Sequence, residues 1–137
     1  MTDMELCSKA LEAMKNSYSP YSNYAVGAAL LCANGKVYTG CNIENSAFSP
    51  TVCAERTAIF KAVSEGEKVF LKIAIAAKKA NENTLDEAVS PCGVCRQVMR
   101  EFCDSNFEIL SVKNNGEYSK YTLGELLPHS FSDDNIK

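Results

Sequence analysis

The sequence predicts a single α/β domain, in which a mixed sheet of about five strands carries helices on both faces. A chain of 137 residues fits one domain, and 46% hydrophobic with 23% charged residues is ordinary for a globular protein. Segments with helical apolar spacing alternate with short β-rich runs, as expected of an α/β fold. No repeat or linker divides the chain, so we expect one domain over residues 1–137, with a frayed tail at 132–137.

The first half of the chain predicts a helix, a β-hairpin and a second helix, over residues 4–16, 24–32 with 36–42, and 53–65. The first helix has an apolar stripe at helical spacing, with Thr2 or Asp3 available as its cap. Asn34-Gly35 favours a two-residue turn between the strands. Gly27 would weaken the first strand, so we expect a bulge there or the close approach of another group.

The second half predicts a buried central strand, a third helix and a second hairpin, over residues 69–77, 93–103, 107–113 and 118–121. A polar, acidic loop over 80–89 is compatible with a short helical turn at Leu85 to Ala88. Thr122 and Glu125 resemble a capping box that opens a helical turn ended by Pro128. The two strand-helix-strand crossovers should be right-handed, which places their helices on one face of the sheet.

Charge and composition argue against several classes of function. A net charge of -3 and a pI near 5.2 disfavour a protein that binds a phosphate backbone, so no nucleic-acid partner is expected. No export signal and no run of eighteen apolar residues occurs, so we expect a cytoplasmic protein without a membrane partner. Seven cysteines, an odd number, then point to reduced thiols. Four are expected as buried apolar side chains: Cys7, Cys32, Cys41 and Cys103.

Three other cysteines form the most specific pattern in the chain. Cys92 and Cys95 follow Pro91 at the start of a predicted helix, where positions i and i+3 share one face. Their sulfurs can converge on one metal ion at about 2.3 Å. Cys53 begins the preceding helix and is the natural third ligand. Three protein ligands leave a tetrahedral position open, as in catalytic zinc sites, so we expect one Zn²⁺ per chain.

Glu55 and Arg56 supply the chemistry that such a site needs. Cys53 and Glu55 form a C-x-E pattern which, followed by P-C-x-x-C, matches the all-cysteine form of a zinc deaminase signature. Glu55 is therefore the candidate general acid and base, although an acid also stabilises a helix N-terminus. Three thiolates leave the site negative, so two helix N-termini and Arg56 are expected to compensate the charge. The alternative for Arg56 is an exposed surface side chain.

Further blocks in the same order along the chain resemble the small homotetrameric cytidine deaminases: Tyr18-Ser19-Pro20-Tyr21-Ser22, Val26-Gly27-Ala28-Ala29, Asn42-Ile43-Glu44-Asn45 and Cys53-Ala54-Glu55-Arg56-Thr57-Ala58. With the Pro91-Cys92 motif and Phe131, the resemblance covers nearly the whole chain. It implies zinc-dependent hydrolytic deamination of cytidine and 2'-deoxycytidine to uridine and 2'-deoxyuridine, with release of ammonia, in pyrimidine salvage. It also implies a homotetramer whose sites lie near subunit contacts.

The resemblance also implies the substrate contacts. Asn42 and Glu44 match residues that bind ribose hydroxyls, and backbone groups at Ala54 match those that hold the pyrimidine edge. Tyr24 matches an aromatic residue that packs on the base, usually Phe in relatives. Phe131 matches an aromatic residue that reaches a neighbouring subunit's site, and plain C-terminal packing is its alternative. For Asn42 and Glu44, the alternative is that they satisfy backbone groups of the loop.

Two other functions compete with a nucleoside deaminase. One is a deaminase of a cytosine-containing antibiotic, as the blasticidin deaminases are, and the intact Asn42-Ile43-Glu44-Asn45 block favours an ordinary nucleoside instead. The other is a structural zinc module that binds nucleic acid, which the acidic pI and the missing fourth protein ligand disfavour. The lone His129 has no suitably spaced partner, so we expect it to be exposed rather than a metal ligand.

Overall fold

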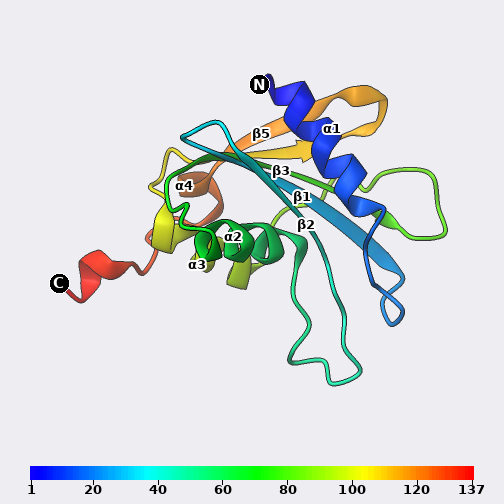
Figure 1. Cartoon of the computed structure of the whole chain (residues 1–137), viewed down its shortest axis with the longest axis horizontal. Helices are drawn as coiled ribbons and strands as arrows, with labels where there is room; N and C mark the ends of the chain where they lie inside the picture. Colours follow the sequence, from blue (N-terminus) through cyan, green and yellow to red (C-terminus); the bar gives the residue numbers. More distant parts are fainter.

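The computed structural model describes residues 1–137 and shows a five-stranded mixed sheet in the order β2-β1-β3-β4-β5 (Figure 1). Only β3 and β4 pair in parallel, and the other neighbours are antiparallel. The strands are β1 (Tyr24–Cys32), β2 (Val37–Cys41), β3 (Phe70–Lys79), β4 (Glu108–Val112) and β5 (Tyr118–Thr122). The helices are α1 (Asp3–Met14), α2 (Ala54–Ser64), α3 (Gly93–Phe102) and α4 (Leu123–Leu126), with 3-10 turns η1 (Asn114–Gly116) and η2 (Asp133–Asn135). The predicted fold class is confirmed.

Apolar side chains form a separate cluster on each face of the sheet. Successive side chains of a strand point to opposite faces, so the buried strands β1 and β3 contribute to both clusters. The cluster under α2 and α3 includes Leu30, Ile59, Ile73 and Met99. The cluster under α1 includes Leu6, Ala10, Ala29 and Ala74. The two crossover helices therefore share one face, as predicted, and α1 covers the other (Figure 1).

Gly27 permits the close approach of α1 to β1. A Cβ atom at this position would lie 2.2 Å from the Ala10 carbonyl oxygen and 2.4 Å from the Met14 backbone nitrogen. Only a glycine allows two backbones to come this close. The predicted close approach is confirmed, and the sheet irregularity lies instead between Leu31 and Cys32.

The turn between β1 and β2 differs from the two-residue turn that Asn34-Gly35 predicts. Cys32 N–H donates to Lys36 O, and Gly35 N–H donates to Cys32 O, so three residues lie in the loop. Gly35 has φ +88°, whereas Asn34 is not in the left-handed region. A two-residue turn of the expected type needs positive φ at both central residues, while a three-residue loop needs it only at its last one.

Three other local predictions have different outcomes. The loop before α3 forms no helix at Leu85 to Ala88 but a single turn one residue later, in which Val89 N–H donates to Asp86 O at 3.4 Å. The Leu85 N–H donates to the Asn114 side chain. The capping box of Thr122 and Glu125 at the start of α4 is confirmed. The C-terminal residues form η2, capped by the buried Ser132, and fraying of this tail in solution stays a prediction.

The cysteines outside the C-x-E and P-C-x-x-C patterns are free thiols. Cys7, Cys32 and Cys103 are buried in the two apolar clusters, as predicted. Cys41 is only half-buried and donates to the Asn16 carbonyl at 3.3 Å, because it lies at the end of the edge strand β2. None of the helices is both long and apolar enough to span a membrane, and the cytoplasmic location stays a prediction.

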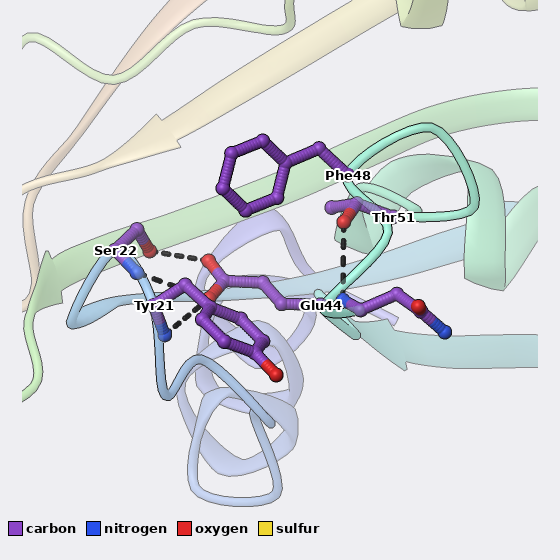
Figure 2. Close-up of a pocket in the computed structure, with 6 residues that line it drawn as sticks. Tyr21, Ser22, Glu44, Phe48 and Thr51 are labelled. Atoms are coloured by element: carbon purple, nitrogen blue, oxygen red, sulfur yellow. Dashed lines mark hydrogen bonds between the residues drawn. The ribbon is translucent and has the colours of Figure 1, made fainter.

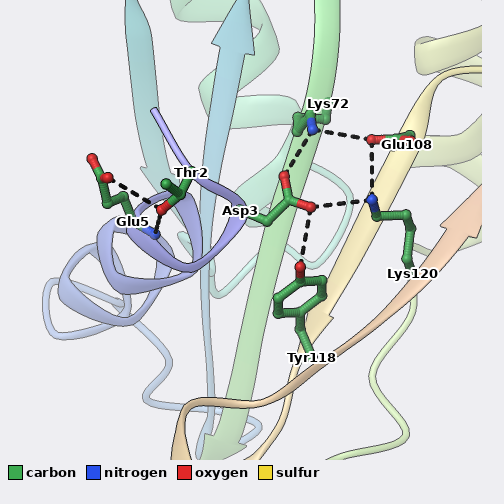
Figure 3. Close-up of polar contacts among 7 residues, drawn as sticks. All are labelled: Thr2, Asp3, Glu5, Lys72, Glu108, Tyr118 and Lys120. Carbon is green, nitrogen blue, oxygen red and sulfur yellow. Dashed lines mark hydrogen bonds and ion pairs between the residues drawn. The ribbon is translucent and has the colours of Figure 1, made fainter.

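A network of ion pairs and hydrogen bonds connects the start of α1 to strands of the sheet (Figure 3). The Asp3 carboxylate accepts from Lys72 Nζ at 2.7 Å, Lys120 Nζ at 3.1 Å and the Tyr118 hydroxyl at 3.2 Å. Glu108 contacts the same two lysines at 3.1 and 3.7 Å. The Lys72 ammonium, foremost among these partners, holds the pKa of Asp3 below its ordinary value.

We predict that Asp3→Asn lowers the free energy of unfolding by about 1–2 kcal/mol at neutral pH, since bonds to a charged acceptor are lost. Because the folded pKa of Asp3 is lowered, its contribution is fully present above the unfolded pKa of about 3.9 and is lost as pH falls through the folded value. Denaturant unfolding at pH 7 and pH 3 should show the gap between variant and wild type shrinking in acid. A gap that stays constant, or an equal effect of Asp133→Asn in the tail, would contradict this.

Candidate active site

Two helix N-termini bring the three predicted zinc ligands together. Cys53 is the N-cap residue of α2, and Cys92 is the N-cap residue of α3. Neither side chain makes the usual capping hydrogen bond, so both sulfurs remain available to a metal. Cys95 lies in the first turn of α3 and is fully buried. Segments about forty residues apart in the sequence thus present three thiols at one point.

The spacing of these sulfurs fits a tetrahedral zinc site. All three Sγ atoms lie within 4.8 Å of one another, and those of Cys53 and Cys92 are 3.7 Å apart. Two sulfurs bound tetrahedrally at about 2.3 Å from zinc would be separated by roughly 3.8 Å. The cluster contains no fourth His, Cys, Asp or Glu. The donor set therefore suits zinc with one coordination position left for a reactant.

Arg56 lies against the thiol cluster rather than on the surface. Its Nη2 donates to Cys53 Sγ at 3.3 Å, and its Nε is buried without a hydrogen-bond partner. Hydrogen bonding from Cys95 and from the guanidinium lowers the pKa of Cys53 to about 5. The neighbouring Cys53 and burial raise the pKa of Cys95. Without a cation, the Cys53 thiolate thus disfavours deprotonation of Cys95. A bound cation would favour deprotonation of both, because it stabilises every thiolate that coordinates it.

We predict that Arg56→Ala keeps most of the zinc but lowers activity by roughly 10–100-fold, because removing a group that bonds to a metal ligand has effects of this size. Metal analysis by mass spectrometry and steady-state kinetics would measure the two quantities. Arg100, an arginine of α3 that contacts Ser130 and Asp134, offers a matched control in Arg100→Ala. Unchanged activity in Arg56→Ala would mean that the contact with Cys53 has no catalytic consequence.

Glu55 is buried beside the ligands, with 4% of its surface exposed. Its side chain belongs to the first turn of α2 and lines the cavity next to Cys53 and Cys92. Burial, the largest influence, raises the pKa of Glu55 to about 7. A carboxyl group with a pKa in this range can both accept and donate a proton near neutral pH, which is the property a general acid and base requires.

The cavity in front of the cysteines has a volume of about 620 Å³ and is lined by fifteen residues. None of them is a lysine, arginine or histidine, whereas three are acidic: Glu44, Glu55 and Asp86. The other lining residues are Ser22, Tyr24, Val26, Asn42, Thr51, Val52, Cys53, Ala54, Ala88, Val89, Ser90 and Cys92. As the first residue of α2, Ala54 carries an N–H group with no partner inside the helix, available to a ligand.

Asn42 is buried just beyond the end of β2 and binds the backbone of β1. Its Oδ1 accepts from Val26 N–H at 3.0 Å and from the Ser17 hydroxyl, while its Nδ2 donates to Tyr24 O at 2.8 Å. The amide oxygen has thus used both lone pairs, but one N–H of Nδ2 remains free. The alternative for Asn42 therefore holds in part, because its side chain binds backbone groups. It also keeps one N–H donor at the cavity wall that a ligand can use.

Glu44 is held in the same manner by the loop that precedes β1 (Figure 2). Its Oε1 accepts from Tyr21 N–H at 2.9 Å and Ser22 N–H at 3.1 Å, and its Oε2 accepts from the Ser22 hydroxyl. One lone pair of Oε2 therefore stays available. Tyr21 and Phe48 flank this carboxylate with ring centroids 6.2 Å apart. Both rings are exposed, at 53% and 75%.

The structure brings all but one of the predicted site residues to this cavity or its cysteine cluster. Phe131 is the exception, because it follows α4, lies 60% exposed, and only its backbone oxygen is bound, by Gln97 Nε2 at 2.9 Å. It does not line the cavity of its own chain. Its predicted role in a neighbouring subunit's site stays a prediction. His129 is exposed, as predicted.

One residue that lines the cavity and one that holds a neighbouring loop were not predicted from the sequence. Asp86 lines the cavity and accepts a hydrogen bond from the Tyr24 hydroxyl, 62 positions away, at 2.6 Å. Arg96 clamps the loop that precedes α3: its Nε donates to Pro91 O at 2.6 Å and its Nη2 to Ser90 Oγ at 3.1 Å. Its Nη1 also reaches Leu126 O at 2.6 Å, which ties this loop to the end of α4.

Comparison with known proteins agrees with this geometry. The model of the cytidine and deoxycytidylate deaminase zinc-binding region matches residues 1–111, which include all three cysteines. The chain belongs to this family. The matched region also contains Glu55 and Arg56. The zinc-binding cysteines and the buried acid of this deaminase-family chain therefore all lie within the part of the chain that matches the family.

Relatives of this deaminase family match the chain over nearly its full length. A cytidine deaminase of Sporosarcina psychrophila is 44% identical over 132 residues, covering 96% of this chain and 93% of the relative. The crystal structure of cytidine deaminase from Burkholderia pseudomallei superposes with a TM-score of 0.85 at 38% identity, covering 96% of this chain and 100% of that one. A more distant relative, the blasticidin-S deaminase of Bacillus cereus, is 33% identical over 133 residues, with 95% of this chain and 92% of the relative covered.

Proposed function

We propose that this chain is a zinc-dependent cytidine deaminase that hydrolyses cytidine and 2'-deoxycytidine to the uridine products and ammonia. The observation that carries the proposal is the buried Glu55 beside three convergent thiols, at one wall of a cavity large enough for a nucleoside. The matched family and its full-length relatives support the same activity. An ammonia-release assay on cytidine, with zinc quantified in the same sample, tests it.

The residues of the chain account for the proton transfers of this hydrolysis. When bound, zinc supplies a Lewis acid that activates water at its open position. Glu55 accepts one proton from the attacking water and delivers it to the pyrimidine ring nitrogen. It then accepts a second proton, from the hydroxyl group now bonded to the ring carbon, and delivers it to the amine, which departs as ammonia while the carbonyl forms. Arg56 and the N-termini of α2 and α3 offset the negative charge of the thiolates. The burial of Glu55 keeps bulk water from competing for the proton.

The charges of the cavity favour a nucleoside over a nucleotide. Enzymes that act on phosphorylated substrates place cationic side chains or helix N-termini at the phosphate. Here the cavity has no cationic side chain, and the helix N-termini that reach it, those of α2 and α3, lie at the cysteine cluster. Glu44 and Asp86 are both held as carboxylates, since hydrogen bonds from Ser22 lower the pKa of Glu44 and the hydrogen bond from Tyr24 lowers the pKa of Asp86. A phosphate near these groups would be repelled. Comparing deamination of deoxycytidine and deoxycytidine monophosphate tests this preference.

The free N–H of Asn42 and the free lone pair of Glu44 form a donor and an acceptor that suit sugar hydroxyls. We predict that Asn42→Ala and Glu44→Ala narrow the preference for cytidine over free cytosine, which for a site built around hydroxyls can reach roughly 10⁴–10⁵. The ratio of kcat/KM values for the two substrates measures it. Asn45→Ala is a neighbouring control, because the Asn45 side chain turns back to the Ala47 N–H. If both variants retain the full preference, the sugar is recognised elsewhere.

The competing functions are separable by direct assay. The blasticidin-S deaminase among the relatives makes antibiotic deamination a real alternative, and the Asn42-Ile43-Glu44-Asn45 block again favours an ordinary nucleoside. Cytidine should be turned over with the higher kcat/KM when cytidine and blasticidin S are compared. A structural zinc module would hold zinc but release no ammonia from either.

A homotetramer with sites near subunit contacts is the proposed assembly. Exposed aromatic side chains at Tyr21, Phe48 and Phe131 support it, because large apolar side chains left in water are typical of interfaces. Phe131, outside its own cavity, would then be free to meet a neighbour's site. Analytical ultracentrifugation should give about four times the 14.9 kDa chain mass, and a fully active monomer would refute the proposal.

A further inference from the structure

Tyr24 and Asp86 form a hydrogen bond in the wall of the cavity. Neither residue is a predicted zinc ligand, and neither takes part in the proposed proton transfers. Tyr24 is the first residue of β1, and its hydroxyl donates to Asp86 Oδ2 at 2.6 Å. Asp86 lies in the loop between β3 and α3, and both side chains line the cavity that holds Glu55. The bond joins two walls of the substrate cavity that come from different parts of the fold.

Hydrogen bonds with Ala77 and Ala88 hold Asp86 in place, so the bond to Tyr24 is not a loose surface contact. Its backbone N–H donates to Ala77 O, near the end of β3, at 2.8 Å. Its Oδ1 accepts from Ala88 N–H at 3.0 Å, which leaves Oδ2 for Tyr24. The Tyr24 hydroxyl and the Ala88 N–H lower the pKa of Asp86, so the acceptor is a carboxylate at neutral pH. A charged acceptor makes this the stronger kind of hydrogen bond.

Tyr24 is held at both ends. Asn42 Nδ2 binds its backbone oxygen, and Asp86 binds its hydroxyl, so the ring between them cannot swing out of the cavity wall without breaking one bond. The segment after Asp86 continues along the cavity through Ala88 and Val89 and reaches the zinc ligand Cys92. The hydroxyl proton is thereby committed to Asp86, so the hydroxyl does not donate to the substrate.

We propose that Asp86 is a positioning residue for substrate binding, which fixes the Tyr24 ring and the Ala88–Ser90 wall at the separation that a pyrimidine ring requires. This role rests on the proposed deaminase function. Asp86 takes no part in proton transfer, so its loss should weaken binding of the substrate and leave the chemical step intact. An orientation held in advance lowers the free-energy cost of ordering the site when the substrate binds.

Steady-state kinetics with cytidine on the zinc-loaded protein tests the proposal. Tyr24→Phe keeps the ring and removes the bond, and Asp86→Ala removes it from the other side. Each should raise KM by about 3–30-fold with kcat within twofold, since a net hydrogen bond to a charged group has roughly this effect when partly exposed to water. The double variant should be no worse than the more affected single variant, because both remove one interaction.

Two further variants separate positioning from plain stability. Asp86→Asn can keep the Ala88 contact through its oxygen and donate its amide N–H to the Tyr24 oxygen, so it should restore a near-normal KM. Glu87→Ala loosens the same loop elsewhere, because Glu87 binds Asn114 and does not line the cavity, and KM should not change. If Asp86→Ala fails to fold, Tyr24→Phe still provides the test.

Several results would overturn this role. These are an unchanged KM in Tyr24→Phe, additive effects in the double variant, or a rise in KM for Glu87→Ala as large as that for Asp86→Ala. An inactive wild-type protein loaded with zinc would refute the proposed function itself, and this role with it. The two failures are therefore distinguishable.

Discussion

Glu55→Gln should retain zinc and the fold while losing turnover of cytidine by a factor of at least about 10²–10⁴, the usual contribution of a positioned general acid and base. Glu55 lies beside the cysteine cluster but is not one of the three ligands, so the metal donors are untouched. Glutamine has nearly the same shape and cannot accept or return the proton. Ammonia release and zinc content, measured on one preparation, give both quantities.

Glu65→Gln provides the matched control for this substitution. Glu65 is the C-cap residue of the same helix and is exposed, so removing its charge changes α2 without touching the cavity. Its activity should equal that of wild type. A Glu55→Gln protein with a near-normal rate would show that another group moves the proton, and one that loses its zinc would mean that Glu55 acts through the metal site.

Replacing any one of Cys53, Cys92 and Cys95 by alanine should lower bound zinc to well under one per chain and abolish most activity. Binding of a ligand only to the folded state stabilises it, by about 4 kcal/mol when its free concentration is a thousandfold above Kd. Losing the metal should therefore lower the free energy of unfolding by several kcal/mol. Cys95→Ala should have the largest effect on stability, because this side chain is fully buried and its removal also leaves a cavity.

Cys41→Ala is the control for loss of a thiol. Cys41 is half-buried at the end of β2, and its thiol donates a hydrogen bond to the backbone oxygen of Asn16. Zinc content and activity should both stay at the wild-type level. Full zinc occupancy in any of the three ligand variants would mean that the metal is held by other residues.

Local patterns explain why the zinc site is predictable from the sequence. Cys92 and Cys95 need only helical spacing to share a face, and the structure places them in the first turn of α3 as that spacing requires. The meeting with Cys53 depends on the two crossover helices lying on one face, which the handedness of the connections provides. These elements could therefore be located without knowledge of the tertiary contacts.

Features set by distant partners could not be predicted in this way. Asp86 is 62 residues from Tyr24 in a loop without regular structure, so no spacing rule links them. The same loop forms only a single turn at Asp86 to Val89, and the Leu85 N–H just before it donates to Asn114, 29 positions away. The spacing of Asn42 and Glu44 indicates a common side, but the backbone groups that occupy most of their hydrogen-bonding capacity belong to β1 and the loop before it.

Removal and return of zinc tests the central claim most directly. Protein stripped with a chelator should release no ammonia from cytidine, and one equivalent of Zn²⁺ per chain should restore activity in wild type but not in Glu55→Gln. This outcome requires both the three-cysteine metal site and the buried acid beside it. Full cytidine deamination by the metal-free protein, or restored activity in the Glu55→Gln variant, would contradict the mechanism.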